Sequence, residues 1–163
     1  DITGATGDDV IALTAIKREG NIYEAGSKTT THVLSSDWNI RESGIHDVTI
    51  RRVKAHSSIC WVIRLLATGT VIENIKIEDI VDTAQKLHHS TILVGIDPGS
   101  KYGEVLPRGL RNITIRNVEG NTRNALDIKG YLCDSDISEI HCGENGSPVL
   151  THFEGQLDNV KIR

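Results

Sequence analysis

Arg111–Val118 reads Arg-Asn-Ile-Thr-Ile-Arg-Asn-Val, and the chain of 163 residues writes this phrase several times. Glu73–Ile80 reads Glu-Asn-Ile-Lys-Ile-Glu-Asp-Ile, and His46–Val53 reads His-Asp-Val-Thr-Ile-Arg-Arg-Val. Weaker copies lie at 134–140 and 158–162. Each copy opens with Asn or Asp and then alternates apolar with polar residues, which is the period of a β-strand with one buried face. Repeated copies of one strand pattern predict a repeat architecture.

The period of the repeat can be measured on the central isoleucine of each copy. Ile50, Ile77, Ile115, Ile137 and Ile162 are separated by 27, 38, 22 and 25 residues. Further apolar phrases that read as strands fall at 10–13, 62–65, 92–96, 125–128 and 148–153. A hairpin sheet would need two-residue turns, and Asn145-Gly146 is the one Asn-Gly in the sequence. A leucine-rich repeat would need a leucine and asparagine ladder, which is absent. We therefore predict an all-β chain that forms a right-handed parallel β-helix of about five turns.

Composition bounds the domain count and the class of partner. The chain is 38% apolar with one Phe and no Met, so Ile, Val and Leu must build the core of one domain spanning residues 1–163. Long loop insertions are expected at 17–44 and 82–110. A net charge of −4 and a pI near 6.0 indicate neither nucleic acid nor an anionic membrane as partner. No stretch reads as a transmembrane helix or signal peptide.

The ends and the cysteines carry two further expectations. The sequence begins inside a repeat and offers no cap at either end, so we expect further turns upstream, or self-association into a homo-oligomer through uncapped ends. Three cysteines cannot all pair within the chain. Cys133 and Cys142 fall in one repeat, and either they lie close together or they are small buried residues. No Cys-x-x-Cys or His-x-x-x-His spacing occurs, so no metal or other cofactor is expected.

The segment Gly7-Asp8-Asp9-Val10-Ile11-Ala12-Leu13 delivers two adjacent carboxylates to the start of a strand. It resembles the Gly-Asp-Asp-Cys-Ile-Ala-Ile segment of polygalacturonases, glycoside hydrolase family 28. The repeated Asn-Ile-x-Ile-x-Asn-Val phrase is also similar to the pectin-lyase-like superfamily of right-handed parallel β-helices, to which that family belongs. The repeat resemblance covers nearly the whole chain, whereas the catalytic resemblance covers about seven residues.

The resemblance implies an inverting glycoside hydrolase. Asp9 would be the acid that protonates the leaving oxygen, and Asp8 would help to activate water with a third Asp from an earlier turn. Crowded carboxylates would raise the pKa of one of them, as an acid role requires. The alternative interpretation is that Asp8 and Asp9 turn the corner after Gly7.

Alignment of the later repeats on their core residues gives candidate substrate contacts. Trp61 falls where the family has its Gly-His-Gly histidine. Asp127 and Lys129 fall on the family's Arg-Ile-Lys segment. Lys129 keeps the family's lysine, whereas Asp127 places a negative charge at the position of the arginine. Arg64 points outward one turn above Ala12 and would bind an acidic sugar or be a solvated surface residue. His152 lies near the same outer face. We expect a groove where Asp9, Arg64 and Lys129 converge.

The leading functional prediction is a polygalacturonase-like glycoside hydrolase that acts on a polysaccharide or oligosaccharide in an extracellular or periplasmic location. A non-catalytic β-helix is the first alternative, for example an adhesin, a phage tail-spike segment or a carbohydrate-binding scaffold. A polysaccharide lyase or epimerase of the same fold is the second, and it would need a base together with Ca²⁺ or Arg. Fold alone does not choose among these functions.

Overall fold

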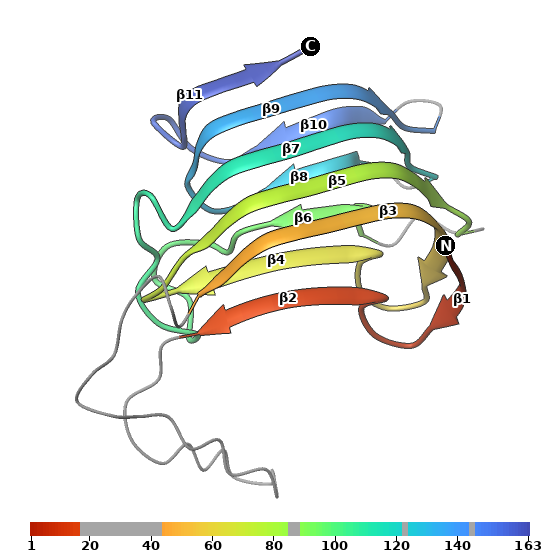
Figure 1. Cartoon of the computed structure of the whole chain (residues 1–163), viewed down its shortest axis with the longest axis horizontal. Helices are drawn as coiled ribbons and strands as arrows, with labels where there is room; N and C mark the ends of the chain where they lie inside the picture. The colour runs from red at the N-terminus through yellow and green to blue at the C-terminus, as the bar shows by residue number, and fades with distance from the viewer. Residues whose placement is uncertain (17–43, 85–88, 122–123, 144–145) are drawn as a thin grey trace, which may run out of the picture.

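Strands that follow one another in the chain alternate between two parallel sheets (Figure 1). The structure is a computed structural model that describes residues 1–16, 44–84, 89–121, 124–143 and 146–163. Sheet A has the order β1-β3-β5-β7-β9-β11, and sheet B has the order β10-β8-β6-β4-β2. Every strand pairing in the described part is parallel. The prediction of an all-β chain is confirmed, and the arrangement is consistent with a parallel β-helix.

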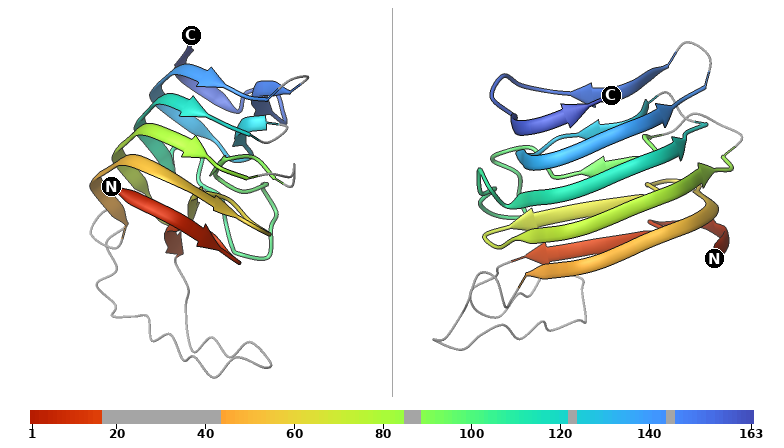
Figure 2. Two further views of the ribbon diagram at one scale, coloured as in Figure 1. Left: turned by 90° about the vertical axis from the view of Figure 1, so that its right-hand side faces the viewer. Right: turned by 45° about the horizontal axis from the view of Figure 1, so that its top comes forward.

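The strands of sheet A are mostly long, and those of sheet B are short. Sheet A consists of β1 (Ile2–Thr6), β3 (Ile45–Ser57), β5 (Ile72–Asp82), β7 (Leu110–Glu119), β9 (Leu132–His141) and β11 (Leu157–Ile162). Sheet B consists of β2 (Ile11–Ile16), β4 (Ile63–Thr68), β6 (Ile92–Val94), β8 (Asn124–Ile128) and β10 (Ser147–Thr151). Both views in Figure 2 show sheet A stacked in sequence order from the N-terminal to the C-terminal end.

The register between repeats is the one that the isoleucine spacing predicts. Ile50 pairs with Ile77, Ile77 with Ile115, Ile115 with Ile137, and Ile137 with Ile162. The spacing in the sequence is unequal because the loops differ in length, whereas each loop leads to a strand in the same register.

The core lies between the two sheets and is aliphatic. Ile77, Ile115 and Ile137 from sheet A are 0% exposed, as are Ile63 and Leu126 from sheet B. Along β5 the burial alternates with the apolar pattern, because successive side chains of a strand point to opposite faces. Each fully buried isoleucine contributes about 1.5–3 kcal/mol through the hydrophobic effect.

The Asn or Asp that opens each phrase has a left-handed backbone. The φ angles of Asp47, Asn74, Asn112, Asp134 and Asn159 lie between 49° and 58°. Asn and Asp adopt this conformation more readily than most residues, which explains their place in the phrase. Their side chains form a ladder across the strands: Asn74 Nδ2 donates to Asp47 Oδ1 at 2.9 Å, and Asn159 Nδ2 donates to Asp134 Oδ1 at 2.8 Å.

The two predicted insertions differ in what the structure describes of them. Apart from Gly44, the segment 17–44 lies outside the described residues. The segment 82–110 contains β6, and its later part returns to the end of β4. There Thr68 Oγ1 donates to the Tyr102 carbonyl oxygen at 2.8 Å, and the Gly69 N–H donates to the Glu104 carbonyl at 2.7 Å. Among the described residues, no apolar helix reaches the length needed to cross a membrane.

Candidate functional site

Asp8 and Asp9 lie in the bend that leads into β2, at one edge of sheet B. The Asp9 backbone N–H donates to Asp8 Oδ1 at 2.8 Å, and the Thr6 hydroxyl donates to the Asp8 carbonyl oxygen. Such short-range bonds are those by which an aspartate stabilises a turn. The corner role that the sequence suggested is therefore present, whatever chemistry the carboxylates perform.

Asp9 is held by two groups from the neighbouring repeat. Arg64 pairs with Ala12 across β2 and β4, as the sequence predicts, and its Nε lies 3.0 Å from Asp9 Oδ2. The Trp61 backbone N–H donates to Asp9 Oδ1 at 3.4 Å. The contact with Arg64 is an ion pair whose alignment does not meet hydrogen-bond geometry. The Asp9 side chain is only 5% exposed, so both carboxylate oxygens are already engaged.

The carboxylate of Asp8 is exposed and shifted toward the ionised form. The Asp9 N–H and, after it, a hydrogen bond from the Cys60 thiol hold the pKa of Asp8 below its ordinary value. Burial first, and then the bond to Asp8, raise the pKa of Cys60. The pKa of Asp8 is therefore lowered, because the hydrogen bonds that its carboxylate accepts outweigh the effect of burial. An ionised, exposed Asp8 fits a base better than an acid.

Asp8, Asp9 and Cys60 form a compact group of potential metal ligands. Their ligand atoms all lie within 4.8 Å of one another. The guanidinium of Arg64 is in contact with Asp9, however, and a positive charge there opposes a second cation. The group is therefore better suited to a network of paired charges than to a metal.

Trp61, the predicted counterpart of the family histidine, lies beside this group and is half-buried. Its ring packs against that of His89, with centroids 5.3 Å apart and an interplanar angle of 38°. Trp61 therefore contacts His89 through its ring and Asp9 through its backbone N–H.

Asp127 and His152 contact each other directly. His152 Nε2 donates to Asp127 Oδ1 at 2.6 Å, and their side chains are 32% and 13% exposed. Gln156, which is buried, fixes this corner because its Oε1 accepts the His152 N–H at 2.8 Å and its Nε2 donates to the Gly130 carbonyl at 2.9 Å. The sequence placed Asp127 and His152 near one face but did not pair them, and Gln156 was missed because no repeat pattern marks it.

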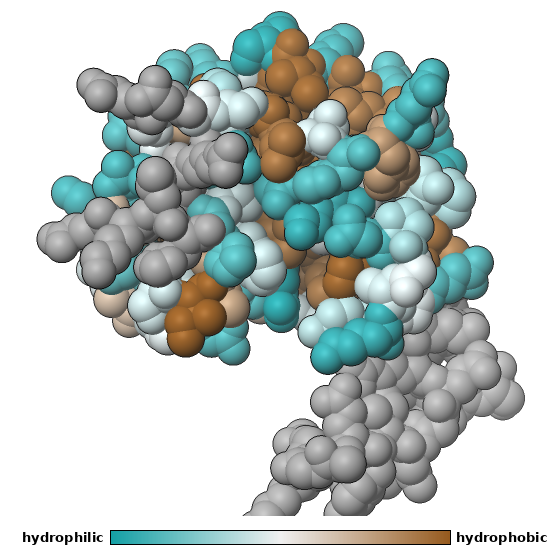
Figure 3. Space-filling model, turned by 180° about the vertical axis from the view of Figure 1, so that it is seen from behind, coloured by the Kyte–Doolittle hydropathy of each residue, from teal (hydrophilic) through white to brown (hydrophobic). Residues whose placement is uncertain are grey.

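Lys129 lies apart from the carboxylate pair. Its Nζ is 4.0 Å from Asp97 Oδ2, near the exit of β8. Three strand spacings and about five residues separate it from Asp9, which corresponds to roughly 20 Å. The structure therefore brings Asp9 and Arg64 together but leaves Lys129 outside that group. Figure 3 looks onto this outer side of sheet B, where hydrophobic and hydrophilic residues are intermixed.

The cysteines are free thiols. Cys133 is buried, whereas Cys60 and Cys142 are half-buried. Cys133 is a small buried residue, as one of the two interpretations of the sequence predicted, and no disulfide joins it to Cys142.

Comparison of the chain with models of known protein families, with curated proteins and with solved structures found no match. The resemblance to the pectin-lyase-like superfamily therefore stays a prediction that rests on the motifs of the sequence.

Proposed function

We propose that sheets A and B are faces of a right-handed parallel β-helix of about five turns, one for each copy of the strand phrase. The alternation of consecutive strands between two parallel sheets supports this proposal, because one coil then advances each sheet by one strand. The repeat phrase and the Gly-Asp-Asp segment support a relationship to the pectin-lyase-like superfamily.

We further propose that the chain acts on polysaccharide outside the cytoplasm as a polygalacturonase-like glycoside hydrolase. The observation that carries this proposal is the geometry: the exposed Asp8 carboxylate lies next to a second carboxylate, that of Asp9, which the half-buried Trp61 contacts through its backbone. Asp8 would activate water, and Arg64 and Trp61 would contact the sugar. Asp9 would have to leave Arg64 in order to protonate a leaving oxygen.

The second candidate is a non-catalytic polysaccharide-binding β-helix, and the geometry of Asp9 favours it. A carboxylate that is 5% exposed, with Arg64 at one oxygen and the Trp61 N–H at the other, is poorly accessible to a substrate. In this candidate the Asp9–Arg64 pair joins β2 to β4, and Asp8 and Trp61 remain as surface contacts for sugar.

Release of reducing ends from a panel of plant and bacterial polysaccharides distinguishes the two candidates. The full chain would be compared with Asp8→Asn, Asp9→Asn and the control Asp136→Asn, which changes an aspartate of sheet A. Release that both site variants abolish and the control keeps supports hydrolysis. Binding of polysaccharide without release, unchanged in Asp9→Asn, supports the non-catalytic protein. Release that depends on Ca²⁺ and produces unsaturated ends would contradict both and indicate a lyase.

A further inference from the structure

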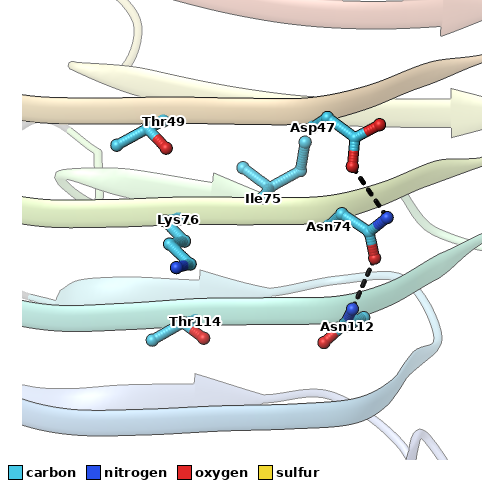
Figure 4. Close-up of a pocket in the computed structure, with 7 residues that line it drawn as sticks. All are labelled: Asp47, Thr49, Asn74, Ile75, Lys76, Asn112 and Thr114. Atoms are coloured by element: carbon cyan, nitrogen blue, oxygen red, sulfur yellow. Dashed lines mark hydrogen bonds between the residues drawn. The ribbon is translucent and has the colours of Figure 1, made fainter.

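The outer face of sheet A carries a groove on the side of the molecule opposite to sheet B. The cavity has a volume of about 290 Å³ and spans β3, β5 and β7. One rim is the amide ladder of Asp47, Asn74 and Asn112, and the other is the column of Thr49, Lys76 and Thr114 (Figure 4). None of these residues belongs to the group around Asp8 and Asp9.

The repeat itself builds the two rims. Thr49 pairs with Lys76, and Lys76 with Thr114, so a hydroxyl, an ammonium and a hydroxyl stand in line across three strands. The left-handed residues Asp47, Asn74 and Asn112 bend each strand two residues earlier, which turns their side chains into a second parallel row. The backbone at Ile75 lies between the rows, and the Ile75 side chain is fully buried.

The two rims differ in the hydrogen-bonding capacity that they leave for a ligand. The ladder is largely occupied, because Asn74 donates to Asp47 and accepts from Asn112, and His46 Nδ1 lies 2.7 Å from Asp47 Oδ2. Lys76 is exposed and has no ion pair or hydrogen bond within the described part of the chain. The three donors of its ammonium are therefore available.

Two charged side chains line the groove, Lys76 and Asp47, and the Asp47 carboxylate is already engaged by Asn74 and His46. Two residues further along the same three strands, Arg51 pairs in register with Glu78, and Glu78 with Arg116. Arg116 Nε lies 3.0 Å from Glu78 Oε1, so these two charges compensate each other. Arg51 and Lys76 remain as cations without an ion-pair partner among the described residues. An anionic group is therefore attracted to this part of sheet A.

The arrangement of donors selects among anions. Neighbouring strands lie roughly 4.8 Å apart, which is close to the advance of one sugar along an extended glycan. Thr49 and Thr114 can exchange hydrogen bonds with sugar hydroxyls on either side of a carboxylate that Lys76 binds.

We propose that this groove is a second carbohydrate site, which binds an acidic saccharide through the Lys76 ammonium and the Thr49 and Thr114 hydroxyls. The site lies away from the Asp8–Asp9 group and needs no hydrolysis. Its function would be to hold an acidic polysaccharide along sheet A while the opposite face remains free.

Binding to polygalacturonate, measured by affinity electrophoresis and by calorimetry at low salt, tests the proposal. Lys76→Gln is expected to weaken binding about three- to fivefold, the size expected for one exposed charge pair. Lys54→Gln is the matched control, because it removes an exposed charge of the same sheet outside the groove. Thermal unfolding of both variants shows whether the fold is kept. Release of reducing ends, measured separately on the wild-type chain, tests the hydrolase proposal, so that its failure can be told apart from failure of this site.

Three results would overturn the proposal. Equal binding by Lys76→Gln and Lys54→Gln would show that the groove is not the site. Equal binding of a neutral galactan and of polygalacturonate would show that the groove does not prefer an acidic saccharide. Tighter, Lys76-dependent binding of a single-stranded RNA of the same charge would show a general anion surface instead of a saccharide site.

Discussion

Asn74 provides the sharpest test of how the repeat phrase specifies the fold. Its φ angle is 55°, where most L-residues with a Cβ are disfavoured by about 1–2 kcal/mol and Asn somewhat less. Its amide also donates to Asp47 at 2.9 Å and accepts from Asn112. At a partly exposed position, two such bonds together contribute about 1 kcal/mol.

Two substitutions separate the backbone effect from the hydrogen bonds. Asn74→Ala loses both bonds and adds backbone strain of about 1 kcal/mol, so it is expected to lower the free energy of unfolding by about 2 kcal/mol. Asn74→Gly loses the same bonds but tolerates the left-handed φ, and its cost is expected to be about 1 kcal/mol. Glycine should therefore be more stable than alanine at this position.

Lys76 gives the matched control, because it is exposed and lies in the same strand two residues later. There the order is expected to reverse, since glycine weakens the interior of an extended strand. Equilibrium unfolding in urea, followed by circular dichroism, measures the free energy of unfolding of all four variants. The values are compared with a common m-value, the slope of the free energy against urea concentration. Equal stability of the alanine and glycine variants at position 74, or a preference for glycine at position 76 as well, would contradict the role of the left-handed backbone.

Three further predictions concern the core, the corner at β10 and the carboxylate pair. Ile77→Ala is expected to cost about 3 kcal/mol and Ile162→Ala under about 1 kcal/mol, because the first side chain is fully buried and the second is 44% exposed; equal losses in urea unfolding would contradict the observed core. Gln156→Leu is expected to cost about 2–4 kcal/mol, because the buried Gly130 carbonyl and the part-buried His152 N–H lose their partner. A neutral result in the same assay would remove that role. Because Asp8 helps to raise the pKa of Cys60, alkylation of Cys60 should stay slow until the pH passes the ordinary thiol value of 9.0. Asp8→Asn should make the alkylation faster at pH 8 because more of the thiol is ionised. Equal alkylation rates of the two proteins, measured by site-resolved mass spectrometry, would show that the two groups do not interact.

The strand pattern predicted the pairing of the five phrases, but not the pairing of β1, which carries no copy of the phrase. The isoleucines of five phrases predicted the register of sheet A, because a half-buried strand allows one alternation and a shift by one residue would expose the core. The outward position of Arg64 beside Ala12 followed from the same alternation.

Side-chain contacts outside that alternation were not predictable. The sequence indicated that Asp9 and Arg64 are near each other, but not that the pair leaves Asp9 only 5% exposed. His152 meets Asp127 through the loop after β10, and loop geometry is set by contacts such as those of Gln156, which leave no period in the sequence. The groove predicted from the sequence required Lys129 to lie near Asp9 and Arg64, and the distance between β2 and β8 prevents this.

The repeat phrases stack in parallel in one register, and an engineered disulfide pair tests this register most directly. Glu78 pairs with Arg116 across β5 and β7, with Cα atoms about one strand spacing of ~4.8 Å apart. In a background with the three native cysteines replaced by alanine, Glu78→Cys with Arg116→Cys should form an intramolecular disulfide on mild oxidation. The offset pair Glu78→Cys with Thr114→Cys should not, because its Cα atoms lie roughly 8 Å apart, beyond the reach of a disulfide. Cross-linking of the offset pair in preference to the paired positions would contradict the register and everything placed by it.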